Sequence, residues 1–213
     1  MFKAIGKTLV FISLISGLGL FVVHLQEGKL EDQVRKVFPN IYGTQPLAMK
    51  GGDPYIRALM RTITASEANV SKPYHVIYGG EYVSDLSSHP NRCVPIGKGF
   101  KCSTAAGRYQ FLNTTWDEKA KRYHPKVSGL LLWKSYSFEP EYQDAVVYAW
   151  LQDTQAWGVD ISQLLRQGKI QQVLKLLSGT WTSLGYGHET NFMSRYLPQI
   201  YDNMLQEELD FDH

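Results

Sequence analysis

The stretch "TASEANVSKPYHVIYGGEYVSD", residues 64–85, joins a helical pattern to a strand-like pattern around one carboxylate, Glu67. Upstream of Glu67, apolar residues recur at helical spacing. Asp53 and Pro54 supply a helix N-cap and a proline at the first helical position. We therefore predict a helix over residues 54–66, with Glu67 at its end.

Glu67 lies at the C-terminal end of this predicted helix, where a negative charge is unfavourable with the helix dipole. A residue placed against its local preference is a mild indication of function. Most glutamates near helix ends are nevertheless solvated surface charges. From its position alone, the surface charge is therefore the favoured interpretation of Glu67, and an acid beside a cleft is the alternative.

The rest of the chain places a small β region between helical patterns. Residues 76–84 alternate loosely and indicate a strand, and residues 92–103 indicate a hairpin with Cys93 on one arm and Cys102 on the other. We expect further helices over residues 113–123, 140–155, 161–167, 170–177 and 191–207. Pro198 would kink or split the last of these helices. The predicted fold class is α+β, with helix dominant.

The two cysteines are expected to form a disulfide, Cys93–Cys102, across the short segment "VPIGKGFK". Closing so short a loop contributes about 2–3 kcal/mol in the chain-entropy model. Such a bond persists only in an oxidising compartment, so the pair favours an exported protein. Two reduced thiols are the alternative. We expect no metal site, because two sulfurs without a matched histidine pair do not make a zinc site.

The N-terminal residues 1–25 resemble a secretory signal, with Lys3 and Lys7 before an uncharged run over residues 9–23. No small-residue cleavage motif follows, which favours an uncleaved, single-pass signal-anchor, with its N-terminal end in the cytoplasm and the remainder outside. The run is short and contains serine and glycine, so insertion should be marginal and release from the membrane is an open alternative. A buried core helix is the other alternative.

Three further regions complete the expected organisation of the chain. Residues 26–52 are interpreted as a linker that opens with charge and ends in Gly-Gly. Residues 53–207 form the expected globular domain, which has ample material for one core. Residues 208–213 form an acidic tail, which we expect to be frayed or solvated.

The composition and the motifs exclude several classes of function. The 213 residues carry a formal net charge of +2 and no basic stripe, so a dedicated nucleic-acid partner is not expected. No G-x-S-x-G, H-E-x-x-H or phosphate-binding loop occurs, so we expect neither a metal nor a cofactor. Aromatic residues make up 13% of the chain, which suits stacking on sugar rings and a well-packed core equally.

Two further segments carry candidate binding groups. In "GRYQ", Gly107 permits a close backbone approach, and Arg108, Tyr109 and Gln110 offer hydrogen bonds and a ring face. In "GYG", Tyr186 lies between two glycines, which indicates either a cleft wall or an ordinary turn.

Five segments, taken in order, resemble the lambda-phage endolysin family of lytic transglycosylases, glycoside hydrolase family 104, over about residues 55–201. They are "SE" at 66–67, "YHVIYGGEYVSDLSSHP" at 74–90, "STAAGRYQFL" at 103–112, the segment at 139–145 and "GYG" at 185–187. The resemblance implies an α+β lysozyme-like fold with a cleft between two lobes. It also implies cleavage of the MurNAc–GlcNAc β-1,4 bond of peptidoglycan without a cofactor.

By this resemblance, Glu67 matches the catalytic acid of the family. Tyr109 and Gln110 match the segment that engages the sugar next to the scissile bond, and Arg108 adjoins them. Tyr186 matches the tyrosine of the far wall.

In the first wall segment, Gly79 and Gly80 match the glycines of the β-lobe, and Tyr78 adjoins them as a further substrate-binding candidate. His75, also counted among the substrate-binding candidates, stands where the phage member of the family has an aspartate. Ala68 replaces an expected glycine after the glutamate.

One acid and no second carboxylate at position 75 suit a transglycosylase, in which Glu67 acts first as acid and then as base. Glu81 and Asp85 remain candidates for a second carboxylate, which a muramidase on the same fold would need. A bacterial wall-remodelling enzyme and a non-catalytic peptidoglycan-binding module are further alternatives to a membrane-tethered phage endolysin. The expected partners are glycan strands and the membrane, and we expect a monomer.

Overall fold

The computed structural model describes residues 44–97, 101–126, 136–186 and 193–211, all of which belong to one unit of the chain, 40–213. The helices are α3 (Pro54–Glu67), α4 (Asn113–Tyr123), α5 (Pro140–Gln152), α6 (Thr154–Trp157), α7 (Ile161–Arg166), α8 (Ile170–Leu177) and α9 (Leu197–Phe211). The strands β1 (Val94–Pro95) and β2 (Cys102–Ser103) form a two-stranded sheet, and two 3-10 turns, η1 (Pro73–His75) and η2 (Ser194–Tyr196), complete the elements. The predicted α+β class, with helix dominant, is confirmed.

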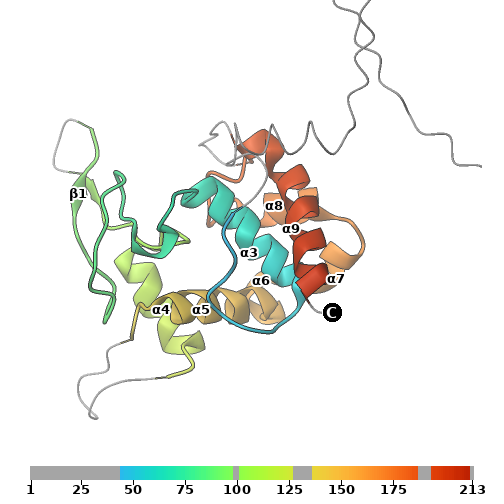
Figure 1. Cartoon of the computed structure of the whole chain (residues 1–213), viewed down its shortest axis with the longest axis horizontal. Helices are drawn as coiled ribbons and strands as arrows, with labels where there is room; N and C mark the ends of the chain where they lie inside the picture. The colour runs from blue at the N-terminus through green and yellow to red at the C-terminus, as the bar shows by residue number, and fades with distance from the viewer. Residues whose placement is uncertain (1–43, 98–100, 127–135, 187–192, 212–213) are drawn as a thin grey trace, which may run out of the picture. The chain divides into compact units, whose positions relative to one another are not determined.

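Helix α3 is the centre of the helical part, where α9 packs along it and α5 and α7 also contact it (Figure 1). Its start is set locally, because the Asp53 side chain accepts a hydrogen bond from the Tyr55 backbone N–H at 3.0 Å and Pro54 occupies the first turn. Burial extends around the helix, and even Arg61 is only 2% exposed. The last two residues of the helix, Ser66 and Glu67, are half-buried.

Helix α9 extends further than the sequence pattern indicated. Pro198 lies in its first turn, where a missing N–H leaves no bond unmade, so it neither kinks nor splits the helix. Glu208 is 3% exposed and accepts hydrogen bonds from Arg57 at 2.5 Å and Arg61 at 3.0 Å. The expectation of a solvated acidic tail from residue 208 was therefore wrong, since α9 continues to Phe211 and its acidic side chains bind α3.

The expected linker over residues 26–52 was wrong for its last nine residues, which pack against the domain. Leu47 is buried, the Thr44 hydroxyl donates to the carbonyl of Arg61 at 3.0 Å, and Gln45 donates to the carbonyl of Ser71 at 2.8 Å. The error arose because these partners follow far along the chain. Residues 26–43 lie outside the described part of the chain.

The single helix expected over residues 140–155 is divided in two. Helix α5 ends at Gln152, and the side chain of Asp153 then caps α6 by accepting from the backbone N–H groups of Gln155 and Ala156. An aspartate in a polar stretch thus acts as a helix N-cap rather than as an interior residue.

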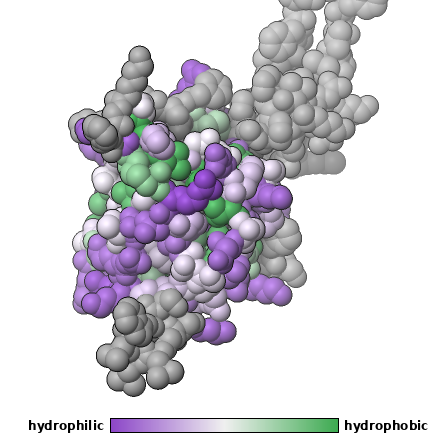
Figure 2. All heavy atoms as spheres, turned by 90° about the vertical axis from the view of Figure 1, so that its left-hand side faces the viewer, coloured by the Kyte–Doolittle hydropathy of each residue, from purple (hydrophilic) through white to green (hydrophobic). Residues whose placement is uncertain are grey.

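The strand expected over residues 76–84 is instead a tight turn with isolated bridges, which join Val76 to Tyr82 and Ile77 to Ala106. Gly79 and Gly80 adopt φ values of +86° and +90°, which disfavour side-chain-bearing residues and prevent a continuous ladder. Figure 2 shows the face on the β1 side of the molecule, where hydrophilic side chains cover much of the surface and hydrophobic groups gather in separate patches.

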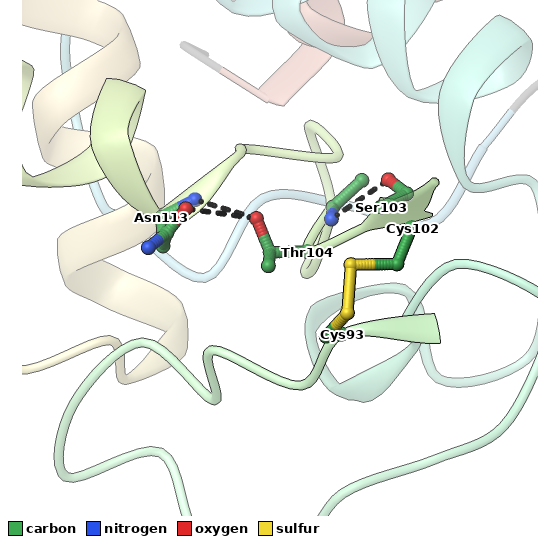
Figure 3. The surroundings of a disulfide bond; sticks show 6 residues. Cys93, Cys102, Ser103, Thr104 and Asn113 are labelled. Carbon is green, nitrogen blue, oxygen red and sulfur yellow. Dashed lines mark hydrogen bonds between the residues drawn. A yellow bond between two sulfur atoms is a disulfide. The ribbon is translucent and has the colours of Figure 1, made fainter. Parts of the chain in front are cut away.

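The predicted hairpin and its disulfide are confirmed. Strands β1 and β2 pair antiparallel, and Cys93 is bonded to Cys102 with their Cα atoms 5.3 Å apart. Beside the disulfide, the hydroxyl of Thr104 donates to Asn113 Oδ1 at 2.9 Å and accepts from the Asn113 backbone N–H at 3.2 Å (Figure 3). The base of the hairpin is thereby joined to the start of α4.

Within the described residues, none of the helices is long and apolar enough to cross a membrane. The signal-anchor expected over residues 1–25 lies outside those residues.

Candidate active site

Glu67 is the last residue of α3 and is half-buried. The helix closes behind it where the Ala68 N–H donates to the carbonyl of Thr64 at 2.8 Å. The hydroxyl of Ser183 donates a hydrogen bond to Oε1 of Glu67. A residue far away in sequence therefore contacts the candidate acid directly.

The loop that carries Ser183 is held at several points. The carbonyl of Ser183 accepts hydrogen bonds from the hydroxyls of Ser66 and Ser194, both at 2.8 Å. The flanking Trp181 and Leu184 are buried, and the Trp181 indole donates to the carbonyl of Tyr109 at 3.1 Å. Ser183 consequently sits between two buried anchors.

Gly185 continues this loop toward Tyr186 with a φ of +95°. A side chain at position 185 would bring its Cβ within 3.1 Å of Ser194 Cβ, so both the backbone angle and the space favour glycine. The pattern "GYG" therefore marks a close approach of two segments, and Tyr186 is 46% exposed beyond it.

Arg108 and Tyr109 were expected to contact the substrate, and the structure corrects both expectations because each side chain is 0% exposed. Arg108 donates to the hydroxyl of Thr64 at 2.8 Å and to the carbonyls of Gln45 at 2.5 Å and Pro46 at 3.0 Å. These bonds hold α3 one turn before Glu67. Arg108 is thus a structural support of the acid's helix rather than a sugar ligand.

Tyr109 binds a carboxylate that the sequence analysis did not single out, Asp144. Its hydroxyl donates to Oδ1 of Asp144 at 2.6 Å. The other oxygen, Oδ2, accepts from the backbone N–H groups of Ala48 at 2.7 Å and Met49 at 3.1 Å and from the hydroxyl of Tyr74 at 2.7 Å. Asp144 therefore joins three segments of the chain behind the site.

Burial is the main influence on these groups and raises the pKa of Asp144, which the charge of Arg108 and the hydrogen bonds oppose. Burial and the neighbouring Asp144 charge also raise the pKa of Tyr109 and of Tyr74. The tyrosines consequently stay protonated and can only serve as donors to the carboxylate. The signal in the sequence was a polar pair, Gln143-Asp144, directly before the mainly apolar run 145–151.

Gln110 is half-buried and has a positive φ of +47°. Its side-chain amide donates to the carbonyl of Gly107 at 2.9 Å, within the same turn. A Cβ at position 107 would come within 2.2 Å of Gln143 Oε1, so this turn requires glycine. Gln110 keeps partial exposure, and its contact with a substrate stays a prediction.

The β-side candidates Tyr78, Gly79 and Gly80 are all exposed at the turn, and Tyr78 retains 39% of its accessible surface. His75 is half-buried, and its Nδ1–H donates to the carbonyl of Val83 at 2.9 Å. His75 also lines a shallow pocket together with Lys72, Pro73, Tyr82 and Ser84. Glu67 is not one of the residues that line this pocket.

The two other acidic candidates face solvent. Glu81 pairs with Arg92 at 3.1 Å, and both side chains are more than half exposed. Asp85 is exposed and accepts a hydrogen bond from the backbone N–H of Ser87 at 2.9 Å. Hydrogen bonding to the side chain of Ser87, and then to its backbone N–H, lowers the pKa of Asp85. Both residues thus have local structural partners. In the described part of the chain, no cluster of three or more His, Cys, Asp and Glu side chains could hold a metal ion.

This architecture is similar to two solved structures, lysozyme from bacteriophage lambda and bacteriophage lambda lysozyme complexed with a chitohexasaccharide. Each has a TM-score of 0.53 and 26% sequence identity, and the matches cover 75% and 73% of this chain and 97% of each of those chains. The fold is therefore the α+β lysozyme-like fold.

A sequence model of the Endolysin family matches residues 57–205, and the chain belongs to that family. The endolysin of Escherichia phage lambda is 35% identical over 117 residues, which make up 54% of this chain. The chain spans 64% of the length of that relative, just under two thirds. The family resemblance expected from the five segments is confirmed.

Proposed function

We propose that the protein is a peptidoglycan lytic transglycosylase that cleaves the MurNAc–GlcNAc β-1,4 bond. The observation that carries the proposal is Glu67, a half-buried carboxyl at the end of the central helix that is bound by Ser183 from the opposite end of the domain sequence. Membership of the Endolysin family and a lysozyme-like fold support a glycan substrate.

In the proposed reaction, protonated Glu67 gives its proton to the glycosidic oxygen as the bond to C1 breaks. The N-acetyl group of the substrate stabilises the developing positive charge at C1. The C6 hydroxyl of the same sugar then attacks C1, and its proton returns to Glu67. The product is a 1,6-anhydromuramoyl end, no water is consumed, and one residue serves as acid and then as base.

A hydrolase on the same fold would need a second carboxylate to activate water or to attack C1. The contacts of Glu81 and Asp85 favour structural roles for both, because Glu81 pairs with Arg92 and Asp85 caps a turn at Ser87. This arrangement supports the single-acid reaction over the muramidase alternative.

The test is Glu67→Gln assayed on purified sacculi. We expect the variant to lose at least about 10³-fold in the rate of lysis, because the amide cannot deliver a proton. Glu81→Gln is the matched control, with lysis within about twofold of wild type. Retention of more than a few per cent of activity by Glu67→Gln would refute the assignment of the acid.

Mass spectrometry of the released muropeptides separates the two reactions. Anhydro ends are expected from every cut, and reducing ends from every cut would establish hydrolysis instead. If the wild-type protein bound sacculi without lysing them, it would instead be a non-catalytic peptidoglycan-binding module.

We further propose that residues 1–25 tether the enzyme to the bacterial inner membrane and place the domain in the periplasm, as in a phage endolysin awaiting release. The support is the pair of lysines before a short uncharged run in a chain of the Endolysin family. Fractionation before and after an uncoupler is the test. Full-length protein should move to the soluble fraction, and permanent retention in the membrane would favour a bacterial wall-remodelling enzyme.

A further inference from the structure

We propose that Ser183 is the positioning residue of the candidate acid and stabilises the carboxylate that Glu67 becomes when it gives up its proton. The inference rests on the proposed function and adds a second residue to its mechanism. Its basis is the hydrogen bond from the Ser183 hydroxyl to Oε1 of Glu67.

The geometry of the loop suits this role, because the Ser183 hydroxyl is fixed before any substrate arrives. Two hydroxyls, those of Ser66 and Ser194, bind its carbonyl at 2.8 Å, and the buried Trp181 and Leu184 flank it. Ser66 precedes Glu67, so the same serine that anchors the loop also joins it to the end of α3. A donor held in place costs no reorganisation when charge develops.

The chemistry assigns different tasks to the two carboxyl oxygens of Glu67. Oε1 accepts from Ser183. We therefore assign the proton for the glycosidic oxygen to Oε2. When that proton leaves, negative charge spreads over both oxygens, and the Ser183 hydroxyl stabilises it through Oε1. The same bond keeps the carboxylate oriented until it takes back the proton of the C6 hydroxyl.

A hydrogen bond to the charged form of an acid lowers its pKa, so removing the bond must raise the pKa of Glu67. The enzyme needs Glu67 protonated, and activity is lost as pH rises through that pKa. Loss of the Ser183 hydroxyl therefore moves the alkaline limb of the pH profile to higher pH. It also lowers the maximal rate, because the developing carboxylate loses a donor.

The experiment compares Ser183→Ala with wild type in the full-length, oxidised protein, using initial rates of sacculus lysis as a function of pH. We expect the alkaline limb of kcat/KM to shift upward by about 0.5–1 pH unit and kcat at the optimum to fall by about tenfold or more. KM is expected to stay within about twofold, because in this proposal Ser183 acts through Glu67 rather than on the sugar.

Two further variants distinguish this role from a structural one. Ser194→Ala removes a hydrogen bond to the same loop and should leave the alkaline limb in place. Ser183→Thr keeps a hydroxyl and should return the limb to its wild-type position. An unchanged limb in Ser183→Ala, with or without a lower rate, would refute the positioning role of Ser183.

The failure of this inference is distinguishable from failure of the proposed function. If Glu67→Gln is inactive and the Ser183→Ala limb does not move, the acid stands and only the role of Ser183 is wrong. If Glu67→Gln retains activity, the proposed acid is wrong and the inference on Ser183 falls with it.

Discussion

The charged guanidinium of Arg108 is fully buried. It donates hydrogen bonds to backbone carbonyls and to the hydroxyls of Thr64 and Tyr74. Asp144 is the buried carboxylate of the same region. It accepts hydrogen bonds from the backbone N–H groups of Ala48 and Met49 and from two tyrosine hydroxyls whose raised pKa keeps them protonated. Buried charges persist when each lone pair or proton has a partner. The "GRYQ" segment, which reads as a binding motif, is therefore mainly an internal brace behind the site.

Tyr109→Phe tests that conclusion at a single atom. Because the hydroxyl donates to the buried carboxylate of Asp144, its loss should lower the free energy of unfolding by about 1.5–3 kcal/mol in urea titrations. KM for sacculi should stay unchanged where the variant is folded. Tyr78→Phe is the matched control, since its ring is exposed and its stability should stay within about 0.5 kcal/mol of wild type. If Tyr109→Phe raised KM without lowering stability, Tyr109 would instead be a residue that contacts the substrate.

At the scale of the elements, the hairpin β1–β2 is small, and its pairing involves only two residues on each strand. So short a ladder is not stable in isolation. The disulfide Cys93–Cys102 and the two hydrogen bonds between Thr104 and Asn113 hold it in place. The covalent bond closes the hairpin, and the polar pair attaches it to α4.

Replacing both cysteines by serine should therefore destabilise the domain without dismantling its helical core. We expect a loss of about 2–3 kcal/mol in the free energy of unfolding, because the closed loop is short. Thermal unfolding followed by far-ultraviolet circular dichroism gives the change. Wild type treated with a thiol reductant is the control and should unfold like the double variant. Identical unfolding midpoints for oxidised and reduced wild type would show that the disulfide adds no stability.

At the scale of the whole molecule, the ionisation of His89 makes its contacts with the distant residues Phe111 and Phe138 sensitive to pH. Its Nδ1 accepts from the Asn91 backbone N–H at 3.1 Å, so Nε2 carries the proton and donates to the carbonyl of Phe111 at 2.8 Å. The ring also packs edge-on against Phe138 at 4.8 Å between centroids. Burial lowers the pKa of His89 below its ordinary value of 6.5, and the hydrogen bond to Phe111 and the charge of Asp117 partly oppose this shift.

Since the folded protein disfavours the imidazolium, the unfolded chain binds more protons below pH 6.5. The stability contributed by His89 is therefore complete above pH 6.5 and is lost progressively as pH falls below it. His89→Gln should flatten this part of the curve, at a cost of about 1–2 kcal/mol at pH 7.5 from lost ring packing. Urea midpoints of the two proteins across pH 4.5–7.5 give the comparison. If the urea midpoints of wild type and variant fell in parallel as pH decreased, groups other than His89 would be responsible for the acid sensitivity.

The parts of the fold that follow from the sequence are those that neighbouring residues determine. Asp53-Pro54 starts α3, and the closely spaced Cys93 and Cys102 close the hairpin, because each signal and its effect lie within a few residues. The parts that were misjudged depend on distant partners. Residues 44–52 resembled a linker because Asp144, which binds their backbone, follows about 95 residues later.

The candidate site also contains residues that could be predicted from the sequence and residues that could not. Glu67 could be proposed from its helix end and from the family resemblance, and the structure places it at the end of α3. Arg108 and Tyr109 were predicted to contact the substrate. Polar and aromatic residues beside a glycine form the same sequence pattern whether they line a cleft or make buried hydrogen bonds. Ser183 carries no local signal, since a serine in a turn is ordinary until its partner is known to be a carboxylate.

The attachment of residues 44–49 also determines how the domain would bear mechanical load. A force applied at Thr44 first loads its hydrogen bond to the Arg61 carbonyl and the hydrogen bond from Arg108 to the Gln45 carbonyl. Arg108 in turn transmits the force to Thr64, to which it also donates. The Asp144 carboxylate bears the next share through Ala48 and Met49. Tension on the N-terminal side is thus passed to α3 through Arg61 and Thr64 and to α5 through Asp144.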